Sequence, residues 1–253
     1  MKAAPRGGAA SSTILFIFRS DGRLLAFSEN KMNIVILAAG MGKRMHSRLP
    51  KVLQPIAGRP MIDHVLDASE GLSASPRVVV VGHAAENVME HLADRSDVTF
   101  ALQSPQLGTG HALRQALGQL DRNEPKTLVC LGDVPLLSRR TLEAIAREAE
   151  TSDLVLLTVE LDNPTGYGRI LRNPAGFVRA IVEEKDASPE ERRVREVNTG
   201  IMCLPTSRLD GWLSSLKAAN AQGEYYLTDV IGLAADEGLR ITTVHPEHAP
   251  MKG

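Results

Sequence analysis

The amino-acid sequence predicts an α/β fold, with a Rossmann-like, mostly parallel sheet, helices on both faces and a smaller mixed β region over one edge. From Asn33 onward, short runs rich in Val, Ile and Leu alternate with stretches whose apolar residues recur at helical spacing. The short runs are apolar at nearly every position, which is typical of strands buried on both faces. Shorter strand-like runs follow Tyr167 and indicate the mixed region.

Each predicted element follows from one of these two patterns, a continuous apolar run for a strand or apolar residues at helical spacing for a helix. The predicted strands of the parallel sheet are residues 33–38, 77–82, 98–102, 127–131 and 154–159. The helices predicted between them are residues 61–69, 84–92, 109–120 and 140–150. In the mixed region, strands are predicted at residues 169–171, 177–182 and 200–204. Because ligands of such sheets bind beyond the carboxyl ends of the strands, the residues that follow each strand are the candidates for a site.

Length and composition limit the classes of protein to which the chain can belong. Its 253 residues suffice for one α/β domain with a sizeable core, or for two small domains. The formal net charge of −1 argues against a nucleic-acid partner, because affinity for a phosphate backbone requires concentrated positive charge. Cys130 and Cys203 lie in apolar runs without metal-ligand spacing, which favours buried thiols in a reducing cytosol over a disulfide between them. The histidines also lack metal spacing, and we expect surface or packing roles for them.

Residues 1–31 differ in composition from the rest of the chain. They are rich in Ala, Gly and Ser and contain one apolar run, residues 14–18, followed by polar residues. This run is too short for the core of a secretory signal or for a membrane span. We therefore expect an N-terminal extension that is disordered or stems from an upstream start codon, with the functional domain at residues 32–253 and no membrane partner.

The most informative segment is Ile34-Val-Ile-Leu-Ala-Ala-Gly-Met-Gly-Lys-Arg-Met45, followed by Leu49-Pro-Lys51. Its apolar strand ends at Gly40 and Gly42, where the backbone N–H groups can approach a ligand closely. Lys43, Arg44 and Lys51 then supply positive charge. Because bare N–H groups beside fixed cations attract phosphate, the segment predicts a polyphosphate-binding loop.

Two common phosphate loops do not fit this segment. A Walker A loop needs Ser or Thr after Gly-Lys, where this sequence has Arg44. The dinucleotide fingerprint needs a third glycine at the position of Met45. The segment instead resembles the Leu-Ala-Ala-Gly-x-Gly-x-Arg-Met signature, with its following Pro-Lys, of the sugar-1-phosphate nucleotidyltransferases. An ordinary glycine turn followed by solvated cations is the alternative.

A second motif, Gln103-Ser-Pro-Gln-Leu-Gly-Thr-Gly-His-Ala112, lies between a predicted strand and a predicted helix. Gly108 and Gly110 allow backbone conformations that other residues disfavour, and Thr109 can cap the helix. The amide of Gln103 can read a base edge through its paired donor and acceptor. By itself the motif is equally consistent with a simple strand-to-helix turn. The resemblance implies that Gln103, Gly108 and Thr109 contact uracil and ribose.

The third motif, Leu131-Gly-Asp-Val-Pro-Leu136, places a carboxylate at the end of a strand. Mg²⁺ usually binds one or two carboxylates together with phosphate oxygens, so Asp133 is a candidate metal ligand. The alternative is that Asp133 caps the next helix. The motif resembles the Gly-Asp-x-Pro-Leu element of the family, which implies the metal ligand.

Three later segments offer the mixed donors and acceptors that sugar hydroxyls require. They are Asn163-Pro-Thr-Gly-Tyr-Gly-Arg-Ile170, Ile181-Val-Glu-Glu-Lys-Asp186 and Glu196-Val-Asn-Thr-Gly-Ile201. Each alone is more typical of turns or strand ends. Together with Gln222-Gly-Glu-Tyr-Tyr-Leu-Thr-Asp229, they resemble the bacterial N-acetylglucosamine-1-phosphate uridylyltransferases. The resemblance implies that Gly168, Glu183 and Asn198 bind the N-acetylglucosamine part.

This resemblance implies a cytoplasmic, Mg²⁺-dependent enzyme. It would join UTP and N-acetylglucosamine 1-phosphate into UDP-N-acetylglucosamine and pyrophosphate, feeding peptidoglycan and lipopolysaccharide precursors. The implied catalytic residues are Arg44, Lys51 and Asp133, with Asp133 as the metal ligand. The implied substrate-binding residues are Leu37, Ala38, Ala39, Gly40, Lys51, Gln103, Gly108, Thr109, Leu131, Gly132, Asp133, Gly168, Glu183 and Asn198.

The sequence departs from the family pattern on its C-terminal side. Family members usually continue into a trimer-forming β-helix of hexapeptide repeats with acetyltransferase activity, and no such repeat occurs here. We therefore expect a monomer without that activity. The family's second metal ligand, an Asn, would lie just beyond Gly253, so we expect Asp133 to be the one protein ligand. Two alternatives stay open: another NTP and sugar 1-phosphate pair, such as dTTP with glucose 1-phosphate, and a non-catalytic nucleotide-binding fragment.

Overall fold

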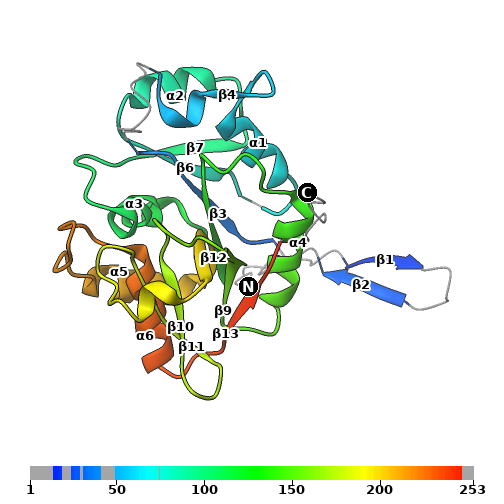
Figure 1. The fold of residues 1–253 in the computed structure, drawn as a ribbon. Coiled ribbons are helices and arrows are strands. Elements are labelled where there is room, and N and C mark those ends of the chain that lie inside the picture. Colours follow the sequence, from blue (N-terminus) through cyan, green and yellow to red (C-terminus); the bar gives the residue numbers. More distant parts are fainter. Residues whose placement is uncertain (1–13, 19–23, 29–30, 41–48, 74, 247–253) are drawn as a thin grey trace, which may run out of the picture.

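The computed structural model describes residues 14–18, 24–28, 31–40, 49–73 and 75–246. Over these residues, the main body is a nine-stranded sheet with helices on both faces (Figure 1). Four neighbouring strands run parallel, in the order β7 (Val98–Leu102), β6 (Arg77–Val81), β3 (Asn33–Leu37) and β8 (Lys126–Leu131). The predicted α/β fold with a mostly parallel sheet is confirmed.

The long strand β12 (Glu196–Pro205) connects the two parts of the sheet. It runs antiparallel to β8 and to β9 (Leu154–Glu160), and β9 pairs in parallel with β13 (Ile241–Val244). Its first residues pair with β10 (Arg169–Arg172), which forms a hairpin with β11 (Val178–Val182). The predicted mixed region is thus continuous with the main sheet.

Strand β12 begins earlier than the predicted strand at residues 200–204. The Asn198-Thr-Gly segment, expected as a turn, belongs to the strand, and its pairing with β9 shifts register between Asn198 and Met202. Gly200 has a φ of +83°, a conformation that L side chains rarely adopt. The turn-like sequence therefore encodes an irregularity inside a strand.

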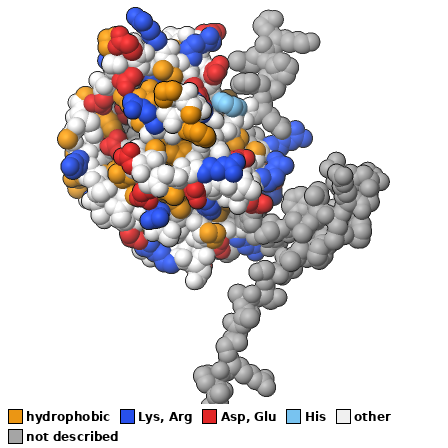
Figure 2. Space-filling view, turned by 90° about the horizontal axis from the view of Figure 1, so that it is seen from below, with side chains coloured by type: hydrophobic (Ala, Val, Ile, Leu, Met, Phe, Trp, Pro, Cys, Tyr) orange, Lys and Arg blue, Asp and Glu red, His pale blue; other side chains and the backbone are white. Residues whose placement is uncertain are grey.

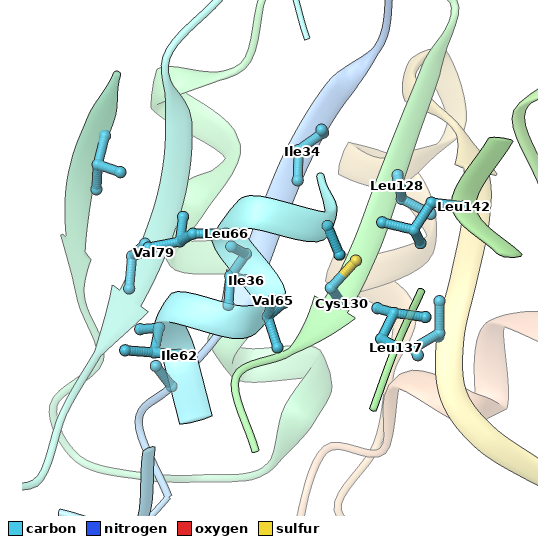
Figure 3. Packing of buried hydrophobic residues seen from close by; sticks show 14 of the residues in the cluster. Ile34, Ile36, Ile62, Val65, Leu66, Val79, Leu128, Cys130, Leu137 and Leu142 are labelled. Atoms are coloured by element: carbon cyan, nitrogen blue, oxygen red, sulfur yellow. The ribbon is translucent and has the colours of Figure 1, made fainter. Parts of the chain in front are cut away.

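Side chains of each central strand alternate between two hydrophobic cores, as the pleat requires. In β3, Ile34 and Ile36 belong to one core and Val35 to the other. The first core, shown in Figure 3, includes residues of α1 (Met61–Ala68), α2 (Ala85–His91) and α4 (Arg139–Glu148). The second includes residues of α3 (Thr109–Ala116), α5 (Leu209–Ser215) and α6 (Val230–Asp236). Two buried faces explain why the strands are apolar throughout.

Smaller elements complete the described chain. Helix α3 ends earlier than predicted because the chain tightens into a 3₁₀ turn at Leu117–Gln119. Two very short strands, β4 (Pro55–Ile56) and β5 (Arg59–Pro60), pair with each other. The other 3₁₀ turns are Lys51–Leu53, Glu191–Arg193, Thr206–Arg208 and Leu227–Asp229.

Ahead of the main sheet, β1 (Ile14–Phe18) and β2 (Leu24–Ser28) form an antiparallel hairpin, for which no strand was predicted. Among the described strands these two pair only with each other. No helix in the described parts of the chain is long and apolar enough to cross a bilayer. On the face seen in Figure 2, Lys and Arg side chains are interspersed with Asp and Glu, so neither sign of charge dominates the described residues there.

Candidate active site

The loops that follow β3 and β8 meet at one edge of the sheet, because these strands are parallel neighbours. The N–H of Gly132 donates to the carbonyl oxygen of Leu37 at 2.9 Å. A Cβ on Gly132 would lie 3.1 Å from Cγ1 of Val52 and 3.4 Å from Cβ of Ala38. Glycine thus lets the loop after β8 pack closely on the end of β3, and the predicted residues of both loops are adjacent.

The backbone after β3 becomes accessible at Gly40, the last residue that the structure describes before the predicted loop continues. Ala38 and Ala39 are buried, whereas Gly40 is exposed and has no described atom within 4 Å of the position that a Cβ would take. A phosphate could therefore approach the backbone of Gly40. The predicted catalytic Arg44 lies outside the described residues.

Lys51 and Asp133 form an ion pair at this edge. Nζ of Lys51, at the start of the 3₁₀ turn after the predicted loop, lies 2.5 Å from Oδ2 of Asp133. The side chains are 41% and 29% exposed, so a ligand can reach both. Asp133 does not cap helix α4, because Ser138 does so by accepting from the N–H of Thr141. The capping alternative for Asp133 is thereby excluded.

The donors at this edge fit a Mg²⁺ ion only in company with a phosphate ligand. Within the described ranges, no group of three or more His, Cys, Asp or Glu side chains could hold a metal ion by itself. Asp133 supplies one carboxylate, and Mg²⁺ commonly takes one carboxylate together with phosphate oxygens and water. The arrangement is thus compatible with an ion that arrives with a nucleotide.

Gln103 lies directly beyond β7, and only 3% of its surface is exposed. Its Nε2 donates to the carbonyl oxygen of Gly108 at 2.9 Å and lies 3.1 Å from Nδ1 of His111. Nε2 thus contacts two protein atoms, and the contact with the Gly108 oxygen is a donation by the amide. Its Oε1 has no hydrogen-bond partner among the described residues, and the expectation that this amide reads a base edge through a paired donor and acceptor stays a prediction.

The Gly108–Gly110 loop is fixed by a distant segment that was also singled out in the sequence. The N–H of Gly110 donates to the carbonyl oxygen of Tyr225 at 2.8 Å, and Oγ1 of Thr109 accepts from the N–H of Leu227 at 3.0 Å. Gly108 has a φ of +106°, and a Cβ there would lie 2.7 Å from the Tyr225 oxygen. Thr109 is the first residue of α3 and not its cap, which corrects the expected capping role.

The three residues expected to bind the sugar also lie together. The N–H of Asn198 donates to the carbonyl oxygen of Gly168 at 2.9 Å. A Cβ on Gly168 would lie 3.3 Å from both carboxylate oxygens of Glu183. A Cβ on Gly200 would lie 2.6 Å from Cδ1 of Leu131, which places the irregular part of β12 against the end of β8. The three residues expected to bind the sugar therefore lie beside the loop that carries Asp133.

The carboxyl of Glu183 lies in an acidic and largely buried environment. Burial raises its pKa above the ordinary value, and the nearby Asp229, Asp186 and Glu224 raise that pKa further. The hydroxyl of Thr228 opposes this effect by donating to Oε1 at 3.0 Å. Glu183 is thus held in place by Thr228, and its pKa is raised.

An almost fully buried arginine anchors the turn that precedes Gly168. Arg169 is 1% exposed, and its guanidinium donates to the carbonyl oxygen of Tyr167 and, at 2.5 Å, to Oε2 of Glu184. The same Oε2 accepts from the N–H of Gly166 at 3.3 Å, and the Arg169 partner lowers the pKa of Glu184. The turn is thereby tied to the residue after Glu183.

Sequence reasoning did not single out His111, Thr228 or the Arg169–Glu184 pair. All four lie inside motifs that were quoted, and His111, Arg169 and Glu184 are close in sequence to a predicted ligand-binding residue. That proximity was the available signal, but the side-chain partners depend on packing between distant segments.

Comparisons with known proteins show the family to which the chain belongs. The family model of the MobA-like NTP transferase domain matches residues 34–199. The chain is 60% identical over 216 residues to the bifunctional protein GlmU of Azoarcus sp. (strain BH72). It is 59% identical over 215 residues to that of Cupriavidus pinatubonensis (strain JMP 134 / LMG 1197). Each alignment covers 85% of this chain and 47% of the relative, so the chain spans about half the length of these curated relatives.

Among solved structures, the chain is similar to a Bacillus anthracis protein assigned as a glucose-1-phosphate thymidylyltransferase, in complex with a sucrose. The TM-score is 0.68 at 20% identity, over 85% of this chain and 87% of that chain. At this identity the likeness shows the fold alone. The match over residues 34–199 and the similarity to the GlmU proteins confirm the predicted resemblance, and we conclude that the chain is a nucleotidyltransferase of the MobA-like NTP transferase domain family.

Proposed function

We propose that this protein transfers a uridylyl group from UTP to N-acetylglucosamine 1-phosphate and releases pyrophosphate. The observation that carries the proposal is the adjacency of two groups at the carboxyl edge of the sheet. The Lys51–Asp133 pair suits the phosphates of a nucleotide, and the group of Gly168, Glu183 and Asn198 suits a sugar. The similarity to the bifunctional GlmU proteins supports the choice of substrates.

In this reaction, a phosphate oxygen of the sugar phosphate attacks the α-phosphorus of UTP. The bond from that phosphorus to the bridging oxygen of the β-phosphate breaks, and pyrophosphate leaves. The nucleophile is already an anion, so no general base is required. The protein contributes positioning and charge neutralisation, the terms that dominate phosphoryl-type transfers.

Lys51 has a direct role in neutralising the nucleotide. Without a ligand, its charge is compensated by Asp133 at 2.5 Å. We propose that Lys51 binds phosphate oxygens in the complex and that Asp133 holds Mg²⁺, which when bound would supply further charge neutralisation at the phosphates. Each side chain thus exchanges its partner in the ion pair for a ligand of opposite charge, and neither is left unpaired. Arg44 is proposed for a similar role.

The remaining expectations belong to the same proposal. The catalytic unit is residues 32–253, acting as a monomer in the cytoplasm, and its product feeds peptidoglycan and lipopolysaccharide precursors. Its partners are the two small-molecule substrates.

Pyrophosphate release from UTP and N-acetylglucosamine 1-phosphate, titrated with Mg²⁺, tests the proposal. The expected result is saturable, Mg²⁺-dependent release that exceeds release from dTTP with glucose 1-phosphate. A preference for the second pair would contradict the proposed substrates. Binding of UTP without release from any pair would instead show a non-catalytic nucleotide-binding fragment.

A further inference from the structure

The amides of two glutamines face the two ring nitrogens of His111. Nε2 of Gln103 lies 3.1 Å from Nδ1, and Nε2 of Gln115 lies 3.1 Å from the ring's Nε2. A neutral imidazole has one donor and one acceptor nitrogen, so it can accept from only one of these amides. The other glutamine must present its oxygen to the ring.

The backbone decides which glutamine donates. Nε2 of Gln103 is 2.9 Å from the carbonyl oxygen of Gly108, so turning this amide would bring two oxygens together. The orientation of the Gln115 amide is less restricted, because its Nε2 lies 3.3 Å from the carbonyl oxygen of His111 and that hydrogen bond is longer. Gln103 therefore donates to Nδ1, the ring proton is on Nε2, and Gln115 turns to accept it.

With both hydrogens engaged, Gln103 can only accept a further hydrogen bond. Its Oε1 has no partner among the described residues. Gln103 is 3% exposed and lies at the edge where the nucleotide is proposed to bind, so an acceptor without a described partner there suits a ligand donor.

We propose that His111 is a positioning residue that determines nucleotide specificity, by accepting the second amide hydrogen of Gln103 and thereby keeping Oε1 as the acceptor presented to the base. The inference rests on the proposed function in that Gln103 faces the base. Uracil and thymine carry a hydrogen on N3 and can donate to Oε1. Cytosine has a lone pair at N3, which Oε1 repels.

The surroundings of His111 suit this role. The ring is 7% exposed, and burial lowers its pKa, with a smaller contribution from Arg114, so the neutral form with its acceptor nitrogen is favoured. Tyr225 lies beside the ring at a centroid distance of 6.5 Å, and the N–H of Gly110, the residue before His111, donates to the carbonyl oxygen of Tyr225. These contacts limit rotation of the imidazole.

The test compares His111→Leu, which removes the acceptor, with His111→Asn, whose Oδ1 can take the place of Nδ1. Calorimetry without sugar phosphate measures the dissociation constants of UTP, CTP and dTTP, and circular dichroism checks that the variants fold. We expect His111→Leu to reduce the preference for UTP over CTP by about tenfold, the effect of losing one buried hydrogen bond. His111→Asn should retain the preference. The UTP to dTTP ratio should stay constant, because both bases carry the N3 hydrogen.

Nitrogen-15 NMR of the wild-type imidazole provides a measurement that does not depend on any variant folding. The expected tautomer has its proton on Nε2, and a proton on Nδ1 would overturn the inference. So would a wild type that does not prefer UTP to CTP, or a His111→Leu variant that weakens both nucleotides equally. A normal UTP preference without pyrophosphate release would overturn the proposed reaction and leave the role of His111 intact.

Discussion

Nζ of Lys51 lies 2.5 Å from Oδ2 of Asp133, so the cation proposed for phosphate and the carboxylate proposed for the metal neutralise each other in the free protein. The two residues are 82 positions apart in the sequence. The proposed function requires this pair to open or be shared when a nucleotide and its metal ion bring opposite charges to the two groups.

Lys51→Met and Asp133→Asn should each reduce turnover by on the order of a hundredfold, the usual effect of removing one charge-stabilising group. The free energy of unfolding should change by less than about 1 kcal/mol, because partly exposed ion pairs contribute little to folding. Pyrophosphate release and urea denaturation measure the two effects. Asp210→Asn, which removes the exposed partner of Arg122, is a control that should change neither. Loss of stability without loss of turnover per folded molecule would contradict the proposed roles.

Gly168→Ala should raise the KM for the sugar phosphate by about tenfold, with little change in the KM for UTP. The added Cβ would lie 3.0 Å from Cγ2 of Ile181 and 3.3 Å from both carboxylate oxygens of Glu183, so the carboxylate must move. Initial-rate kinetics with each substrate varied in turn provide the measurement. Gly118→Ala, where no described atom lies within 4 Å of the new Cβ, serves as the matched control. Equal changes in both KM values would argue against a sugar-specific position.

Glu183→Gln should make the protein relatively more stable at neutral pH. Because the folded-state pKa of Glu183 is raised above the ordinary value of 4.5, its stabilising contribution is present below that value and is lost as pH rises through the folded-state pKa. The free energy of unfolding of the wild type should therefore fall relative to the variant over that interval and then level off. Denaturation at a series of pH values measures this difference, and parallel curves would show that the carboxyl is not perturbed.

Cys130 and Cys203 should not react with thiol reagents in the native protein at pH 8. Both are free and buried, and burial raises the pKa of each thiol to about 12, so the reactive thiolate is scarce. Labelling followed by mass spectrometry should detect both thiols only after denaturation. Rapid labelling of the folded protein would disagree with their burial in the core.

The central part of the fold could be predicted because its signals are local. The unbroken apolar run Ile34–Leu37 and the glycine that follows define a buried strand and its loop without reference to other segments. Helix α5 was not predicted, since it is short, contains Gly211 and is stabilised by packing of Trp212 and Leu213 in the second core. The segment at Asn198 was expected to be a turn, but it belongs to strand β12 because β12 pairs with two neighbouring strands there.

The sequence by itself determined which residues follow the ends of the parallel strands, and hence that Gly40, Gln103 and Asp133 share one edge of the sheet. This was possible because a strand and the loop after it are contiguous in the chain. Only the tertiary structure decided how the polar atoms at that edge are paired. Asp133 pairs with Lys51, and Nε2 of Gln103 contacts the carbonyl oxygen of Gly108 and Nδ1 of His111. Such partners depend on where packing places side chains that the sequence separates, and they determine which atoms are left for a ligand.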